Sequence, residues 1–148
     1  MEKFGLKGKL RVELLDANGF VKDVRDINNL IVNTGKAQVA SLLAQDIAGD
    51  AFRYTAIGTG STAPTASDTA LVSEYMRESS SQTRITTSVA DDTARFETEF
   101  TVTSTVTLQE SGIFNTSSAG TMLNRATFSA LEAVNNDVVK TDWKVQVS

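Results

Sequence analysis

Paired carboxylates are the first residues in this chain whose spacing could support chemistry. Glu97 and Glu99 stand two residues apart, so in a strand both side chains project from one face, as a general acid and a general base would require. No cluster of sugar-binding aromatic residues accompanies them. Arg95 belongs to the same alternation, opposite Phe96 and Phe100. This pattern favours a solvated strand face over an acid–base pair.

Two other short motifs could bind ions. Asp91 and Asp92 are adjacent carboxylates, but they lack the spaced oxygen ligands of a calcium loop, so we interpret them as part of an Asx turn. The segment Gly58-Thr59-Gly60 follows a predicted strand, as a phosphate-binding loop would, but a third glycine and a Gly-Lys-Ser/Thr sequence are missing. We expect these glycines to give the chain a tight exit from the strand with positive φ. The sequence therefore predicts no cofactor and no metal ion.

The amino-acid composition excludes most familiar enzyme mechanisms. The chain contains no His and no Cys, which removes the usual general base, thiolate nucleophiles, disulfides and sulfur metal ligands. Its net charge is −4 and it has no stripe of Lys or Arg, which argues against free nucleic acid as a partner. The N-terminus lacks an apolar signal core, and no apolar run approaches the ~20 residues of a membrane span. We therefore expect a non-enzymatic protein with no membrane partner, made in the cytoplasm.

Glu110 is a carboxylate in an otherwise apolar strand, directly before Ser111-Gly112-Ile113-Phe114. Two structural roles are open for it: it caps a turn, or it pairs with Arg125 across a sheet. We favour the structural pairing over a role at an interface.

The elements that position these residues are predicted to begin with a hairpin. Leu10, Val12 and Leu14 alternate with charged residues before an Asn18-Gly19 turn, and residues 20–25 run back as the second strand. A short strand is expected over residues 29–33.

One principal helix is predicted over residues 35–46. Its apolar residues Val39, Leu42, Leu43 and Ile47 recur at steps of three and four, so we expect an amphipathic helix that covers an open end or edge of the sheets. A strand over residues 52–57 follows. A short second helix is expected over residues 68–75, with the Asp68 side chain as its N-cap.

The rest of the chain is predicted to be all β, with Phe96, Phe100, Phe114 and Phe128 at inward positions. In the last strand, Val139, Thr141, Trp143, Val145 and Val147 face one way and polar residues face the other, so one face is buried. Five extended segments are expected, at residues 84–89, 95–103, 105–114, 121–128 and 138–147.

The predicted fold is mainly β, a β-sandwich or flattened barrel that carries one amphipathic helix and one short helix. We expect residues 1–148 to form a single domain with a short N-terminal arm at residues 1–7, because 148 residues can bury a core without disulfides or metals.

Four segments together resemble a family of small structural proteins of tailed-bacteriophage particles. A closing Trp-x-Val-x-Val strand, Trp143 to Val147, is also similar. The likeness spans nearly the whole chain, and such sequences look like capsid decoration (cement) proteins and like modules that attach fibres. The four segments are Gly8-x-Leu-x-Val12 with Asp16-Ala17-Asn18-Gly19, residues 28–35, residues 56–71 from Ala56-Ile57-Gly58-Thr59-Gly60 to Asp68-Thr69-Ala70-Leu71, and residues 110–128.

This resemblance implies a non-enzymatic virion protein that binds the major capsid protein and stabilises the assembled head, as a homo-oligomer and most simply a homotrimer. The alternatives are a tail or fibre attachment protein and a receptor- or carbohydrate-binding module. One Trp and two Tyr offer few stacking platforms for the last of these. We expect partner contacts through the arm and the loop over residues 59–67, at Met1, Glu2, Lys3, Phe4, Leu6, Thr59, Ser61, Thr62, Pro64 and Thr65.

Overall fold

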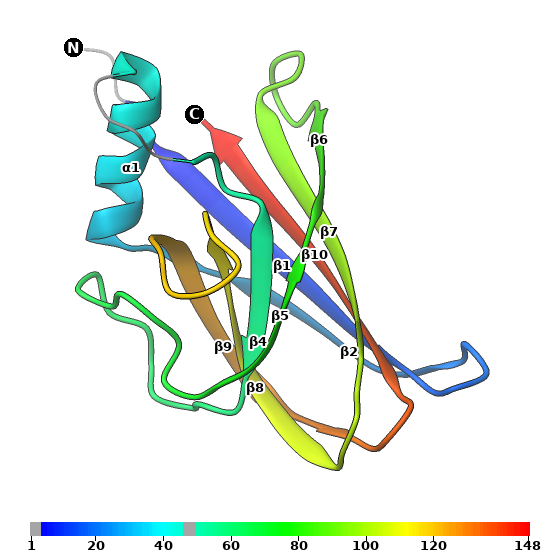
Figure 1. The fold of residues 1–148 in the computed structure, drawn as a ribbon. Helices are drawn as coiled ribbons and strands as arrows, with labels where there is room; N and C mark the ends of the chain where they lie inside the picture. The colour runs from blue at the N-terminus through cyan, green and yellow to red at the C-terminus, as the bar shows by residue number, and fades with distance from the viewer. Residues whose placement is uncertain (1–3, 46–49) are drawn as a thin grey trace.

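Two antiparallel five-stranded sheets pack face to face in this protein (Figure 1). A computed structural model describes residues 4–45 and 50–148. The two sheets do not close into a barrel. Of the two expected architectures, the structure therefore has the β-sandwich.

The first sheet contains both ends of the described chain. Its strand order is β2-β1-β10-β7-β6, with bounds β1 Leu6–Leu15, β2 Val21–Asn28, β10 Val138–Val147, β7 Thr93–Thr101 and β6 Ser81–Ile85. The order of the second sheet is β3-β9-β8-β4-β5, with bounds β3 Leu30–Ile31, β9 Met122–Ala133, β8 Val106–Phe114, β4 Tyr54–Gly58 and β5 Glu74–Ser79. The helix α1, Asn33–Ala44, lies beside one end of the sandwich (Figure 1).

The predicted hairpin and the predicted last strand are confirmed. Gly19 occupies the β1–β2 turn with φ of 85°, a conformation that glycine adopts without steric penalty. In β10, the alternate residues from Val139 to Val145 are buried against the opposite sheet, whereas Val147 at the strand end is exposed. Trp143 is fully buried opposite Leu10 of β1 and Phe96 of β7. Alternation with a period of two therefore predicted which face of this sheet forms the core.

The core lies between the sheets, and a second, smaller apolar cluster lies on the outer face of the second sheet. Phe96, Phe100 and Phe128 contribute to the main core as predicted. Phe114 is buried too, but it follows the core residue Ile113 in β8 and therefore faces the other way. The second cluster consists of Val32, Ala56, Leu71, Phe114 and Met122.

The second helix predicted over residues 68–75 is wrong. This segment is irregular up to β5, which begins at Glu74. Leu71 is anchored in the second apolar cluster, and the amides of Val72 and Ser73 donate to a side chain instead of to carbonyls one turn earlier. The Asp68 carboxylate folds back to accept from Thr65 and so does not act as a helix cap.

The helix α1 is present, but its predicted apolar face points the wrong way. Leu43 is 75% exposed and Leu42 is also exposed, whereas the buried residues are Gly35, Gln38 and Ser41. Asp46 and Ile47 lie outside the described residues. Val39 is half-buried and packs against the main core, so the prediction holds for this residue. The other side chains that the helix buries are small or polar, and Leu42 and Leu43 face its surroundings.

Gly35 explains this orientation. A Cβ atom at Gly35 would lie 2.3 Å from the carbonyl oxygen of Leu123, so only glycine lets the helix backbone approach β9 this closely. Helical periodicity cannot detect such a contact, because it locates apolar residues and not the side on which a backbone approaches.

The arm predicted over residues 1–7 overlaps β1, which already begins at Leu6. Leu6 and Lys7 belong to β1, where they pair with Val147 and Gln146 of β10. Gly5 and Ser148 exchange backbone hydrogen bonds of 2.7 and 2.9 Å, so the residue before β1 lies beside the residue after β10. Within residues 4–45 and 50–148, no helix is long and apolar enough to span a membrane.

Candidate functional site

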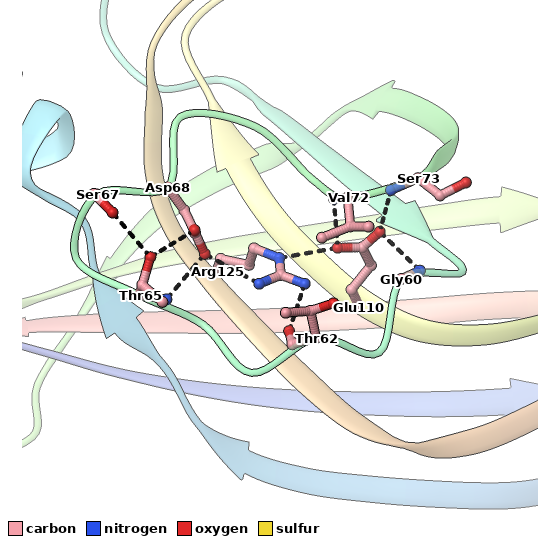
Figure 2. Close-up of polar contacts among 9 residues, drawn as sticks. All are labelled: Gly60, Thr62, Thr65, Ser67, Asp68, Val72, Ser73, Glu110 and Arg125. Carbon is pink, nitrogen blue, oxygen red and sulfur yellow. Dashed lines mark hydrogen bonds and ion pairs between the residues drawn. The ribbon is translucent and has the colours of Figure 1, made fainter.

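A buried ion pair joins the two central strands of the second sheet beneath the loop that connects β4 to β5. Glu110 of β8 and Arg125 of β9 are 0% and 1% exposed, and Arg125 Nε lies 2.9 Å from Glu110 Oε2 (Figure 2). The predicted pairing of these two residues is confirmed. A buried pair of this kind persists only when further hydrogen bonds satisfy its remaining polar atoms.

Three loop amides satisfy the Glu110 carboxylate. Its Oε1 accepts from the amides of Gly60 at 2.9 Å and Ser73 at 2.8 Å, and its Oε2 accepts from the amide of Val72 at 3.0 Å (Figure 2). Glu110 thus performs both of the structural roles left open by the sequence, because it caps a loop and pairs with Arg125. One carboxylate holds the beginning and the end of the loop over residues 59–73.

Arg125 holds the middle of the same loop. Its Nη2 donates to the carbonyl of Thr62 at 2.8 Å, and its Nη1 donates to Asp68 Oδ2 at 3.0 Å. Asp68 in turn accepts from the amide of Thr65 at 3.0 Å and from its hydroxyl at 2.7 Å. Burial raises the pKa of Asp68, but the hydrogen bonds from Thr65 and Arg125 outweigh it and hold that pKa below its ordinary value. The loop is therefore fixed at several points along its length (Figure 2).

A β-bulge turns Glu110 toward the loop. Leu108 lies in the main core, and strict alternation would place Glu110 there as well. The β8–β9 register shifts between these two residues, so Glu110 faces the outer side of the sheet. Regular strand periodicity could not have predicted this reversal.

Gly58 and Gly60 have a different role from the one expected. The described glycines with positive φ are Gly19 and Gly120, so the predicted positive-φ exit from β4 is wrong. A Cβ atom at Gly58 would lie 2.3 Å from the Ser73 carbonyl, and one at Gly60 would lie 2.6 Å from Glu110 Oε1. These glycines make room for the carboxylate and for the returning loop.

The predicted contact residues of the loop lie at its surface. Ser61, Thr62 and Thr65 are exposed, whereas Thr59 and Pro64 are half-buried. The fixed backbone therefore displays mostly small side chains, with Val72 as a larger exposed residue near its end.

The predicted contact residues of the arm lie at the opposite end of α1. Phe4 is exposed and Leu6 is half-buried, and both line a groove with Val39 and Leu43 of the helix. Met1, Glu2 and Lys3 lie outside the described residues. The loop reaches the beginning of α1, where the amide of Asn33 donates to the Ala66 carbonyl at 2.8 Å. The structure therefore places the two predicted contact segments at the two ends of one helix, about 18 Å long.

The other carboxylates that sequence analysis considered belong to a solvated sheet face and to a turn. Glu97 and Glu99 are exposed and pair with Arg95 at 3.0 Å and Lys140 at 3.1 Å. Asp92 lies in a turn as predicted, but it is not an Asx turn, because its carboxylate accepts from the preceding amides of residues 87–89 and not from an amide two residues later. Hydrogen bonds from the backbone, first that of Val89, hold its pKa well below its ordinary value. Among the described residues, no group of three or more acidic side chains gathers as a metal site would require.

Sequence reasoning missed the five other partners of the ion pair, which are the Asp68 carboxylate, the Thr62 carbonyl and the amides of Gly60, Val72 and Ser73. Asp68 carried a signal, because Asp followed by small residues is typical of turns as well as of helix caps. The backbone groups carried no such signal in the sequence.

Comparisons with protein-family models, with curated proteins and with solved structures found no match.

Proposed function

We propose that this chain is a structural protein of a bacteriophage particle that acts by binding and not by catalysis. Specifically, it is a decoration protein that attaches to the major capsid protein of the assembled head and stabilises the shell, as a homotrimer. The observation that carries the binding role is the loop over residues 59–73, which the buried Glu110–Arg125 pair fixes in one conformation. The assignment to a phage particle depends on the sequence resemblance.

The structure of the loop supports adhesion to a protein surface. Binding orders flexible side chains and loops, so a loop that is already ordered loses less entropy when it binds. Small side chains such as Ser61, Thr62 and Thr65 allow the partner to approach the backbone closely. Each contact can be weak, because a repetitive lattice multiplies it through high effective concentration.

The buried aromatic residues favour a protein partner over a carbohydrate. Trp143 is fully buried, and its Nε1 donates to the hydroxyl of Ser111 at 3.2 Å. Tyr54 and Tyr75 are half-buried. A sugar ring stacks on an exposed aromatic face, and these three residues present none that is fully open.

The first test is the copy number of the chain in purified particles of the phage that encodes it. A decoration protein should be present at a fixed ratio to the major capsid protein, whereas a fibre attachment protein should match the much smaller number of tail components. Quantitative gel staining measures this ratio. Absence of the chain from purified particles would refute the proposal, and a low copy number would favour the tail or fibre role.

The second test concerns the loop itself. Thr62→Arg places a long side chain on the exposed loop surface but keeps the backbone carbonyl that Arg125 binds. Thr105→Arg is the matched control, because Thr105 is exposed in the β7–β8 connection, outside this loop. We expect the loop variant to lose occupancy on particles that lack the wild-type protein, and the control to retain it. Equal occupancy of both variants would exclude the loop as the contact.

A further inference from the structure

Two apolar surfaces lie at opposite ends of this molecule. The first, the helix-end groove, lies between the N-terminal segment and α1 and is lined by Phe4, Leu6, Ile31, Val39, Ala40 and Leu43. The second, the hairpin tip, consists of three exposed residues: Phe20 in the β1–β2 turn, Val21 at the start of β2 and Val134 in the β9–β10 connection. In Figure 1, α1 lies near the beginning of β1 and the β1–β2 turn lies at the other end of this strand.

The helix-end groove is open and apolar. Phe4 is 66% exposed and Leu43 is 75% exposed, because α1 turns its large apolar residues away from the sandwich. The groove holds about 470 Å³. This volume lies within the range of roughly 300–1,000 Å³ that is typical of sites for compact apolar ligands, so one aromatic side chain can enter it.

The hairpin tip presents an aromatic side chain on a rigid turn. Phe20 is 72% exposed, although the turn that carries it is fully hydrogen-bonded. Asp16 Oδ1 accepts from the amides of Asn18 at 2.9 Å and Phe20 at 3.0 Å, and the Phe20 carbonyl accepts from the Asp16 amide at 2.9 Å. Rigid exposed aromatic residues of this kind dominate the energetics of protein interfaces.

These two surfaces cannot meet within one molecule. β1 runs from Leu6 beside the groove to Leu15 before the hairpin turn, and ten residues of strand span roughly 30 Å. Each surface therefore needs a second molecule to cover it.

The charges around the two surfaces are complementary. Lys36 lines the groove, and Lys7 and Lys9 line the depression that adjoins it, with no carboxylate among the described residues that line either one. Around the tip, Lys22 pairs with Asp137 and Arg25 pairs with Asp23, so among these residues and Asp16 only the Asp16 carboxylate is outside an ion pair. The tip therefore carries a small net negative charge, opposite in sign to that of the groove, which favours contact between the two unlike surfaces.

We propose that the occupant of the helix-end groove is the hairpin tip of a second copy of this chain, with Phe20 inserted against Phe4 and Leu43. The contact is head to tail, so an open assembly always keeps one free groove at one end and one free tip at the other. Contacts of this type close into rings or extend into filaments. The contact does not depend on the proposed attachment to a capsid and can be tested without particles.

The experiment uses two variants with complementary defects. Phe20→Ser removes the tip residue and leaves the groove, whereas Leu43→Ser damages the groove and leaves the tip. Both residues are exposed, so both variants should fold. Val89→Ser, at an exposed apolar residue that lines neither surface, is the matched control.

Sedimentation velocity over a range of concentrations provides the readout. We expect the wild-type chain and the control to self-associate, and each defective variant to raise the dissociation constant by about 30-fold or more. A mixture of the two variants should form a heterodimer that cannot extend further. The Leu43→Ser variant supplies the one intact tip, and the Phe20→Ser variant supplies the one intact groove. Lys36→Glu should weaken association, most strongly at low salt.

Three outcomes would overturn the proposal. The wild-type chain could remain monomeric at about 1 mM. Phe20→Ser could associate as strongly as the control. The mixture of defective variants could stay monomeric while the wild-type chain associates, which would show that the tip and the groove do not bind each other.

Discussion

The loop over residues 59–73 and the helix α1 are neighbours in space, but opposite kinds of interaction hold them. The loop is fixed by charged and backbone groups that are almost all paired, and its exposed side chains are small. The helix makes its closest approach to the sandwich through Gly35, and its large apolar residues are exposed. The loop is therefore ready to bind without reorganisation, whereas the helix leaves an apolar surface that a partner must cover.

The largest expected effect is the loss of stability when the ion pair beneath the loop is broken. Arg125→Met would leave the Glu110 carboxylate buried without its cation, which typically destabilises a protein by about 3–5 kcal/mol. Urea denaturation at neutral pH measures the loss. Lys140→Met, which removes an exposed ion pair with Glu99, is the control and should change stability by less than about 1 kcal/mol. Equal losses in both variants would mean that the buried pair has no special role.

The next effect concerns the helix side. Gly35→Ala should raise helix propensity by about 1 kcal/mol in an isolated helix, yet we expect it to destabilise the protein by roughly 1–3 kcal/mol. The reason is that the new Cβ atom would collide with the Leu123 backbone. Thr34→Ala, at an exposed position of the same helix, should stay within about 0.5 kcal/mol of the wild type. Thermal or urea denaturation compares the two, and a stabilised Gly35→Ala variant would show that α1 does not pack closely on β9.

A smaller effect is the pH dependence of the stability that Asp68 contributes through the loop. Asp68 has a pKa below its ordinary value of 3.8 in the folded protein, so its contribution to stability is complete above about pH 4 and is lost as the pH falls toward its folded-state pKa. Asp68→Asn should lower stability by about 1 kcal/mol at pH 7, since the carboxylate is partly open to solvent. The difference from the wild type should shrink on acidification. Urea curves at pH 7 and pH 3 measure it, and a constant difference would contradict the pKa shift.

The smallest effect is expected at Leu43. Leu43→Ser should change the stability of the monomer by less than about 0.5 kcal/mol, because the side chain is exposed. If α1 instead buried this residue, as its periodicity predicted, the loss would be about 2–5 kcal/mol. Denaturation at low protein concentration distinguishes the two orientations of the helix.

Patterns of period two predicted the fold well. The hairpin, the buried face of β10 and the later strands β7, β8 and β9 were predictable from alternating burial or from turn residues. The edge strands were not: β5 was predicted as a helix, and the strand predicted over residues 84–89 overlaps β6, Ser81–Ile85, only at its end, because neither edge strand has a fully buried face. The Glu110–Arg125 pair was predictable because a charge in an apolar strand needs a partner. These predictions needed only local spacing and one general energetic rule.

The failures have a common physical cause, since each depends on a contact between distant segments. The loop segment from Asp68 to Ser73 is not helical, because Glu110, 37 residues beyond Ser73, binds its amides. The helix turned its apolar residues outward because Gly35 fits against Leu123. Gly60 is needed to accommodate Glu110 and not for its own backbone angle. Local propensity contains no information on any of these contacts.

The hydrogen bonds between Gly5 and Ser148 have a practical consequence for protein engineering. Because Ser148 meets Gly5, which lines the helix-end groove, an affinity tag or fluorescent cargo fused after Ser148 would emerge beside that groove and obstruct it. Circular permutation avoids this problem. A short linker can join the present termini, and new ones can be opened next to the exposed Thr105, beyond the Thr103 and Ser104 groups that Tyr75 binds.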